Sequence, residues 1–230
     1  MQPSIAENLE NVRGTIFEAE KTSKRQPGTV ELVAISKTHS PEVIQEAIEA
    51  GQLVFGENRV QEAKAKLSAL PSKLRWHLVG HLQSNKVRVA LTLFEVIHGI
   101  DSVELLRTME SSAEQLGLFP KALLQVNVAG EASKFGFSPE RLISQLDAIL
   151  QIKRVEILGL MTIPPLARQA EDSRKYFVRL REIRDQIEKE HQIHLPHLSM
   201  GMSGDYAVAV EEGATMVRVG TAIFGQRRSK

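Results

Sequence analysis

A lysine at the end of a predicted strand is the first residue in this sequence that could do chemistry. The stretch LVAISKTHS runs from Leu32 to Ser40, and its apolar residues lead directly into Lys37. Side chains alternate along a strand, so Val33, Ile35 and Lys37 share one face. If that face is buried, desolvation lowers the pKa of the amine and makes a neutral, nucleophilic lysine accessible. Such an amine can form a Schiff base with a carbonyl; the alternative is a strand-end lysine that extends its charge into solvent.

Two glycine-containing segments near the C-terminus could hold a phosphate. The segment HLSMGMSGD places Ser199 and Ser203 around two glycines, and VRVGTAIFG places Gly220 and Thr221 at the end of the last predicted strand. N–H groups at a helix start attract anions, and glycine lets the backbone approach them closely. The alternative is that these glycines only form tight turns. A Schiff-base lysine across one pocket mouth from a phosphate cup is the arrangement that a pyridoxal phosphate site requires.

Eight predicted strands that alternate with helices must position these residues. The strands are continuous apolar runs, which is typical of a parallel sheet covered on both faces. Eight such units in 230 residues predict one (β/α)8 TIM barrel, with residues 1–230 as a single domain and an extra N-terminal helix. An open doubly wound sheet is the alternative architecture. The expected strands are 31–37, 52–58, 75–80, 94–100, 122–129, 155–163, 197–200 and one within 215–225, and the longer expected helices include 138–150 and 167–190.

The composition argues against several other classes of protein. Lys and Arg number 29 against 28 Asp and Glu, so no nucleic-acid footprint or polybasic membrane patch is expected. The absence of cysteine excludes disulfides and zinc–cysteine sites and fits a reducing cytosol. The N-terminus lacks the apolar segment of a secretory signal, and no apolar run approaches the ~20 residues of a membrane span. These features together lead us to expect a cytoplasmic protein. No carboxylate or cysteine is spaced to complete a metal site with His191, His194 and His197, so we expect no metal.

Six segments carry motifs of a known family. They are SKTHS, FGENRVQEA, WHLVGHLQSNK, SKFGF, LGLMTI and LSMGMSGDYAVAVEEGATMVRVGTAIFG. With them the chain resembles the pyridoxal phosphate homeostasis proteins from about residue 30 to the C-terminus. The fold of that family is a single barrel similar to the N-terminal domain of bacterial alanine racemase, in agreement with the strand count.

The resemblance implies a role for individual residues. It implies that Lys37 forms the internal aldimine with pyridoxal 5′-phosphate, that Asn58 lies beside the cofactor ring, and that Arg218 faces the pyridine nitrogen. Lys134 matches a second lysine near the pocket, which assists cofactor transfer. The positions that hold the phosphate are Ser199, Ser203, Gly220 and Thr221.

An arginine beside the pyridine nitrogen limits the chemistry of the ring. A guanidinium has only donors and stays protonated, so it cannot accept a proton from a pyridinium. The carboxylate of most pyridoxal enzymes stabilises the pyridinium and strengthens the electron sink. A ring held by Arg218 therefore suits racemisation with strong flanking bases, or no catalysis at all.

The sequence favours a carrier of the cofactor over a catalyst. Racemisation needs an acid or base on each face of the α-carbon. Lys37 could serve one face, but neither Tyr176 nor Tyr206 obviously opposes it. We therefore expect a monomer that acts in intracellular pyridoxal phosphate (vitamin B6) homeostasis without catalytic turnover, with apo-enzymes that use this cofactor as recipients. A racemase of low activity is the alternative, and a lysine-dependent aldolase barrel is a third class.

Overall fold

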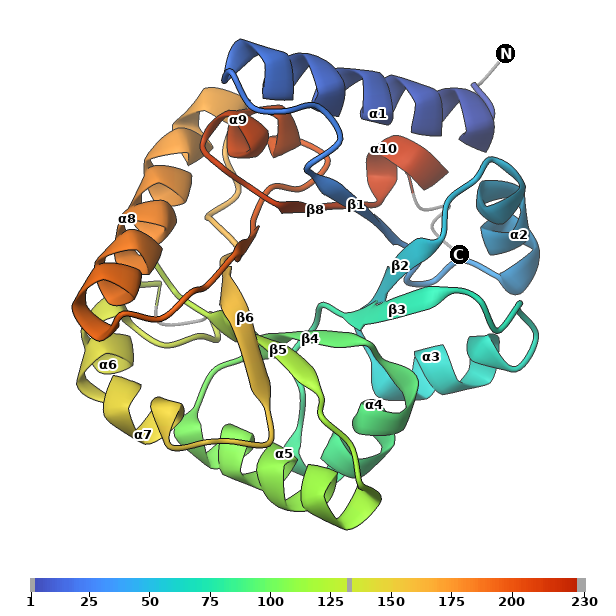
Figure 1. Cartoon of the computed structure of the whole chain (residues 1–230). Helices are drawn as coiled ribbons and strands as arrows, with labels where there is room; N and C mark the ends of the chain where they lie inside the picture. The colour runs from blue at the N-terminus through green and yellow to red at the C-terminus, as the bar shows by residue number, and fades with distance from the viewer. Residues whose placement is uncertain (1–2, 132–133, 227–230) are drawn as a thin grey trace.

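Eight parallel strands form a closed barrel in chain order, and helices surround it (Figure 1). The computed structural model describes residues 3–131 and 134–226 of the chain. Strand β1 (Glu31–Ile35) pairs with both β2 (Val54–Glu57) and β8 (Met216–Val219), which closes the barrel. The predicted (β/α)8 barrel is confirmed, and the open sheet is wrong. The other strands are β3 (Arg75–Leu78), β4 (Val96–Ile100), β5 (Lys121–Gln125), β6 (Glu156–Met161) and β7 (His197–Ser199).

The helices follow the strands, with two departures from the predicted boundaries. The helix expected over 138–150 is broken at Gln145 into two shorter helices. The helix expected over 167–190 begins only after an irregular stretch, with a short 3-10 turn that Gln169 and Asp172 cap. The helices are α1 (Ile5–Thr22), α2 (Pro41–Glu49), α3 (Val60–Leu67), η1 (Ser84–Lys86), α4 (Val87–Leu93), α5 (Val103–Leu116), α6 (Pro139–Ser144), α7 (Leu146–Leu150), η2 (Ala170–Ser173), α8 (Arg174–His191), α9 (Tyr206–Glu211) and α10 (Thr221–Phe224).

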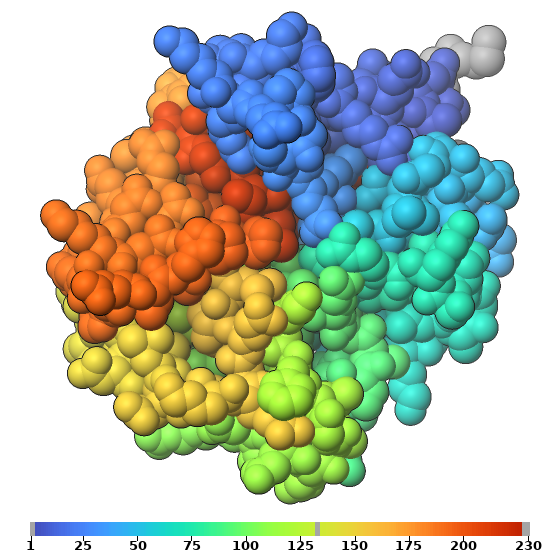
Figure 2. Space-filling view, in the orientation of Figure 1, coloured from blue at the N-terminus to red at the C-terminus, as the bar shows by residue number. Residues whose placement is uncertain are grey.

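The extra N-terminal helix α1 covers the place where the barrel closes (Figure 1). It begins with a capping box, in which Ser4 Oγ accepts from Glu7 N and the Glu7 carboxylate accepts from Ser4 N. Asn8 Nδ2 donates to Ile223 O at 2.9 Å, which ties α1 to α10. In the space-filling view the atoms of α1, in dark blue, lie along the upper edge of the molecule (Figure 2). Within the described part of the chain, no helix combines the length and apolar character needed to span a membrane.

The inward face of β1 is apolar and leads directly to the predicted functional lysine. Val33 and Ile35 cluster with Val54 and Val79 inside the barrel. The space between them is full, because a Cβ added to Gly56 would lie 2.5 Å from Ile35 Cδ1. The first strand therefore has the predicted face inward, and the next residue of that face lies at its C-terminal end.

Candidate functional site

A cavity of about 580 Å³ opens at the C-terminal ends of the strands. This is the end of a TIM barrel at which functional sites are built, and the volume is that of a small-molecule site. The loops that follow several different strands contribute to its wall. Six of the seven residues expected at the site line this cavity: Lys37, Asn58, Ser203, Arg218, Gly220 and Thr221.

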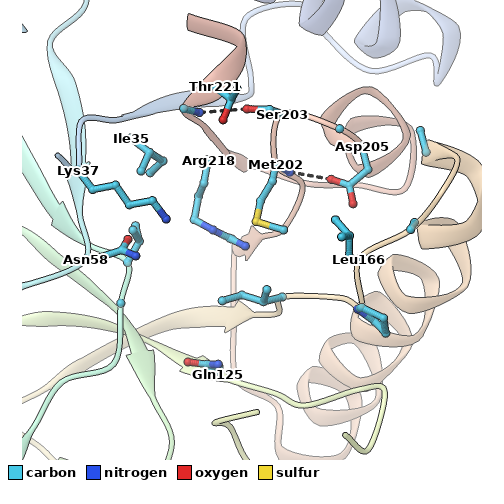
Figure 3. A pocket seen from close by; sticks show the side chains of 18 of the residues that line it. Ile35, Lys37, Asn58, Gln125, Leu166, Met202, Ser203, Asp205, Arg218 and Thr221 are labelled. Carbon is cyan, nitrogen blue, oxygen red and sulfur yellow. Dashed lines mark hydrogen bonds between the residues drawn. The ribbon is translucent and has the colours of Figure 1, made fainter. Parts of the chain in front are cut away.

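Lys37 projects into the cavity from the turn that follows β1. The strand ends at Ile35, two residues earlier than expected, and Lys37 is half-buried. Figure 3 shows its side chain extending towards Arg218, with Asn58 close by. The next residue, Thr38, has a φ of +68°, in the left-handed region that a β-branched residue rarely adopts. The chain thus turns sharply immediately after Lys37. The helix that follows therefore runs in a different direction from β1.

A buried ionic cluster outside the cavity fixes the chain on both sides of Lys37. Lys66 Nζ donates to the carbonyl of Ser36 at 2.9 Å, to Glu57 Oε1 at 2.9 Å and to Glu62 Oε1 at 2.7 Å. The Ser36 hydroxyl donates to Glu57 Oε1 at 2.7 Å, and the N–H of Thr38 donates to Glu62 Oε1. One lysine and two carboxylates therefore hold the residue before Lys37 and the residue after it.

The two carboxylates of this cluster have opposite pKa shifts. Burial raises the pKa of Glu57, and the hydrogen bonds from Lys66 and Ser36 only partly offset that effect. Burial also acts to raise the pKa of Glu62, but hydrogen bonds from Lys66 and Thr38 lower it overall. None of these contacts was predicted from the sequence. The spacing of Glu62 and Lys66, four residues apart on one helix, was the available signal, but it does not reveal the contact with Ser36.

Ser203 and the turn after β8 form a polar cup at one side of the cavity. Ser203 Oγ accepts from the N–H groups of Gly220 and Ala222, both at 3.2 Å. The carboxylate of Asp205 accepts from Met202 N at 2.7 Å and fixes the glycine loop that carries Ser203 (Figure 3). A Cβ at Gly220 would lie 3.3 Å from both Cβ and O of Ile35, so glycine allows this turn to pack against the first strand.

Arg218 supplies a buried positive charge to the same cavity. Its guanidinium donates to Ser199 Oγ at 2.6 Å and to Thr162 O at 2.8 Å, and Figure 3 shows it facing Lys37. Burial lowers the pKa of Arg218 to about 10, although the charge of Asp205 acts in the opposite direction. The group therefore remains protonated near neutral pH, with further N–H donors beyond the two that these contacts use.

The position of Ser199 differs from the expectation for a phosphate-binding residue. Its side chain is fully buried at the end of β7, and it is absent from the cavity wall. Its hydroxyl accepts from Arg218 and lies 2.9 Å from His98 Nδ1, so it supports the guanidinium from beneath. Ser199 and Ser203 flank the same glycine loop in the sequence. Their positions in the sequence do not show that the side chain of Ser199 points into the barrel interior.

Beneath Ser199, two buried histidines extend this polar chain. His98 Nε2 lies 3.0 Å from His77 Nδ1. Burial lowers the pKa of His77 to about 4 and places the pKa of His98 well below its ordinary value, so both rings are neutral at pH 7. These histidines hold one another and Ser199 rather than a metal. No group of three potential metal-ligating side chains occurs among residues 3–131 and 134–226.

The last expected residue, Lys134, lies beside the cavity. Its Nζ is 3.3 Å from Glu131 Oε1, and its neighbour Phe135 lines the cavity wall. Ser133, the first residue of the SKFGF motif, lies outside the described residues. The structure thus places Lys134 next to a residue of the cavity wall.

Comparisons with known proteins agree with this barrel. The family model described as alanine racemase, N-terminal domain, matches residues 7–228, which defines the class of the chain. The chain is 44% identical over 226 residues to the pyridoxal phosphate homeostasis protein of Aquifex aeolicus, and the match covers 98% of this chain and 99% of that one. It is 42% identical over 228 residues to the Pseudomonas aeruginosa protein of the same name, with 97% and 96% covered. The chain therefore belongs to the pyridoxal phosphate homeostasis protein family.

Solved structures extend the comparison to three dimensions. The chain matches PipY of Synechococcus elongatus PCC7942, solved with pyridoxal phosphate bound, at a TM-score of 0.84 and 42% identity, covering 96% of this chain and 100% of that one. Alanine racemase of Clostridium difficile matches at a TM-score of 0.70 and 15% identity, covering 94% of this chain and 60% of that enzyme. The second likeness shows a shared fold and nothing more.

Proposed function

We propose that this protein binds pyridoxal 5′-phosphate as a Schiff base with Lys37 and acts in cofactor homeostasis and supply. The observation that carries the proposal is the convergence of an amine, a buried guanidinium and a glycine turn on one cavity of about 580 Å³. The match to PipY, solved with pyridoxal phosphate bound, supports it at 42% identity.

The residues present fit the aldehyde, the ring nitrogen and the phosphate of this cofactor. Lys37 Nζ supplies the amine for the aldehyde carbon, Asn58 lies where it can contact the ring, and Arg218 can donate to the ring nitrogen. The hydroxyls of Ser203 and Thr221 are the proposed donors to the phosphate, and Ser203 Oγ holds the turn at Gly220 by accepting its N–H. When bound, the cofactor supplies an aldehyde that reacts with amines and a ring that withdraws electrons.

The same residues favour a carrier over an enzyme. Arg218 stays protonated at neutral pH and cannot accept a proton, so it weakens the ring as an electron sink. In the described part of the chain, neither Tyr176 nor Tyr206 lines the cavity, so neither is placed as the second base of a racemase. We therefore propose binding without catalytic turnover; the alternative is a racemase of low activity. The relatives carry the name of homeostasis proteins, which favours neither a racemase nor an aldolase.

A visible spectrum tests the proposal. Purified protein given pyridoxal phosphate should develop a yellow band that borohydride bleaches, with the added mass on the peptide that contains Lys37. Lys37→Ala should lose that covalent band, whereas Lys64→Ala, on the exposed face of α3, should keep it. A protein that stays colourless with the cofactor contradicts the proposal. Racemisation of an L-amino acid that Lys37→Ala abolishes would favour the alternative.

We propose a monomer in the cytoplasm, with apo-enzymes that require pyridoxal phosphate as recipients of the cofactor. The absence of cysteine supports a reducing compartment. We propose that Lys134, at the edge of the cavity, assists the transfer of the cofactor to these apo-enzymes.

A further inference from the structure

A histidine on the cavity wall contacts an aspartate, and the proposed binding of the cofactor uses neither. His81 follows β3 and Asp101 follows β4, so both lie at the functional end of the barrel. Two glycines bring these strand ends together. A Cβ at Gly80 would lie 2.3 Å from Asn58 O, and a Cβ at Gly99 would lie 2.7 Å from Gly80 O. Only glycine permits this approach, which places His81 close to Asn58.

The imidazole of His81 is held at its edge and on its face. Nδ1 lies 3.1 Å from Asp101 Oδ2, and a carboxylate at one ring nitrogen favours the tautomer with hydrogen on that nitrogen. Phe135 stacks on the ring at 3.9 Å between centroids and 11° between planes. Phe135 is held in turn by Gln125 Nε2, which donates to its carbonyl at 3.0 Å. The ring is therefore positioned, and Nε2 remains as the nitrogen that can accept a proton.

His81 shares the cavity with Lys37 and is accessible to a small solute. Its side chain is 33% exposed, and that of Asp101 is 15% exposed. Among the described residues that line the cavity, His81 is the one imidazole, and the carboxylate of Asp205 is already bonded to a backbone N–H. Imidazole can accept and donate a proton near neutral pH, which neither a lysine nor an arginine in this cavity does as readily.

We propose that His81 is the proton-transfer group that lets a small primary amine replace Lys37 on the cofactor; this inference rests on the proposed function. The incoming ammonium gives one proton to His81 Nε2, and its freed electron pair bonds to the carbon of the C=N bond, whose second electron pair moves to Lys37 Nζ. A second proton passes from the attacking nitrogen to Lys37 Nζ, the remaining bond to Lys37 breaks as the new C=N bond forms, and the released lysine amine receives the proton held by His81. One C=N bond forms, one breaks, and nothing is oxidised or reduced.

This step matters for a protein that must release what it binds covalently. An alkylammonium ion, such as the amino group of an amino acid, is protonated at neutral pH and has no electron pair to attack with. A positioned base removes that proton inside the cavity. The ligand class is therefore a primary alkylamine of amino-acid size, and the cavity of about 580 Å³ suits the cofactor with such a ligand.

The test compares two amines that differ in their need for a base. Protein loaded with pyridoxal phosphate is mixed with ethylamine, which is protonated at neutral pH, or with semicarbazide, whose attacking nitrogen is not. The rate of exchange is read from the change in visible spectrum. His81→Gln should slow exchange with ethylamine about 100-fold and exchange with semicarbazide less than about twofold, since general base catalysis typically contributes 10²–10⁴-fold.

A matched control and a second variant keep the result interpretable. His194→Gln removes the ring of another histidine–carboxylate pair, in which His194 Nδ1 lies 3.0 Å from Glu188 Oε1. The His194 side chain is 83% exposed and precedes β7, at the opposite end of the barrel. It should exchange both amines at the wild-type rate. Asp101→Asn keeps the His81 ring and should slow exchange with ethylamine but not with semicarbazide. This variant tests the role of His81 even if His81→Gln does not fold.

Each outcome decides between distinct conclusions. Equal slowing of both amines, or unchanged exchange with ethylamine, in a folded variant overturns the proton-transfer role of His81. Failure of the wild-type protein to form a visible band with pyridoxal phosphate overturns the proposed function instead. Selective slowing of ethylamine in His81→Gln and Asp101→Asn supports both.

Discussion

At the scale of single residues, the guanidinium of Arg218 depends on a chain of polar groups inside the barrel. Arg218 donates to Ser199, Ser199 contacts His98, and His98 contacts His77. Among the described residues, His77 Nε2 is a buried atom without a hydrogen-bond partner. Because the rings are neutral, they support Arg218 without placing further positive charge beside it. The chain can position a buried cation only while the histidines stay unprotonated.

The unfolding free energy should therefore fall as pH falls through the titration of His77. Its pKa drops from 6.5 to about 4 in the folded protein because of burial, so the unfolded state binds more protons between these values. The corresponding stability is fully present above pH 6.5 and is lost towards pH 4. The shift corresponds to about 3 kcal/mol at 1.36 kcal/mol per pKa unit. Urea unfolding at a series of pH values measures it.

The variant His77→Gln isolates this contribution from that of the carboxylates. It should be less stable than wild type at pH 7 but should lose about 3 kcal/mol less on acidification from pH 7 to pH 4. His194→Gln, exposed on the outer surface, should follow the wild-type profile. If His77→Gln and wild type have parallel profiles, the neutral state of His77 in the fold is disproved.

At the scale of elements, helix α3 fixes the turn that carries the functional lysine. Lys66 reaches from α3 to the carbonyl of Ser36, and Glu62 of the same helix accepts the N–H of Thr38. The lysine side chain is 10% exposed, and the Glu57 side chain beside it is 0% exposed. This pair is therefore expensive to break, because removal of the lysine leaves an uncompensated buried carboxylate.

Lys66→Met should destabilise the fold and slow the reaction of Lys37 with pyridoxal phosphate. Breaking one side of a buried ion pair costs about 3–5 kcal/mol, which urea unfolding at pH 7 would detect. The deficit should shrink at lower pH, because burial already raises the pKa of Glu57 and protonation removes its charge. Lys64→Met, an exposed position on the same helix, is the control and should change stability by less than about 0.5 kcal/mol. Equal stability of the two variants would contradict the role given to Lys66.

The sequence predicts the existence of these elements better than their ends. Apolar runs reveal all eight strands because burial on both faces requires them. Strand ends depend on local conformations, and β1 ends at Ile35, three residues before the left-handed Thr38. Contacts between distant segments are also hidden, since nothing near His81 in the sequence shows that Asp101 will meet it. Six expected site residues line the cavity, while the turn of Ser199 into the barrel required the structure.

At the scale of the whole molecule, the barrel separates stability from binding. The cavity occupies the C-terminal ends of the strands. At the N-terminal ends, Arg75 of β3 bridges Glu31 of β1 at 2.5 Å and Glu95 before β4 at 2.6 Å. TIM barrels commonly build stability at this end and function at the other. The ion pairs of Arg75 link neighbouring parts of the barrel without touching the site.

Arg75→Met should therefore lower stability without altering the binding of pyridoxal phosphate. The Arg75 side chain is 43% exposed, so solvent screening limits the expected loss to about 1 kcal/mol, a fall of a few degrees in Tm for a chain of this size. The Kd for the cofactor and the visible spectrum should match wild type, because no lining residue changes. Arg218→Met removes the cation at the other end and should alter the spectrum and weaken binding. If Arg75→Met weakened binding as strongly as Arg218→Met, the two ends would be coupled, and the geometry of the cup would depend on closure of the whole barrel.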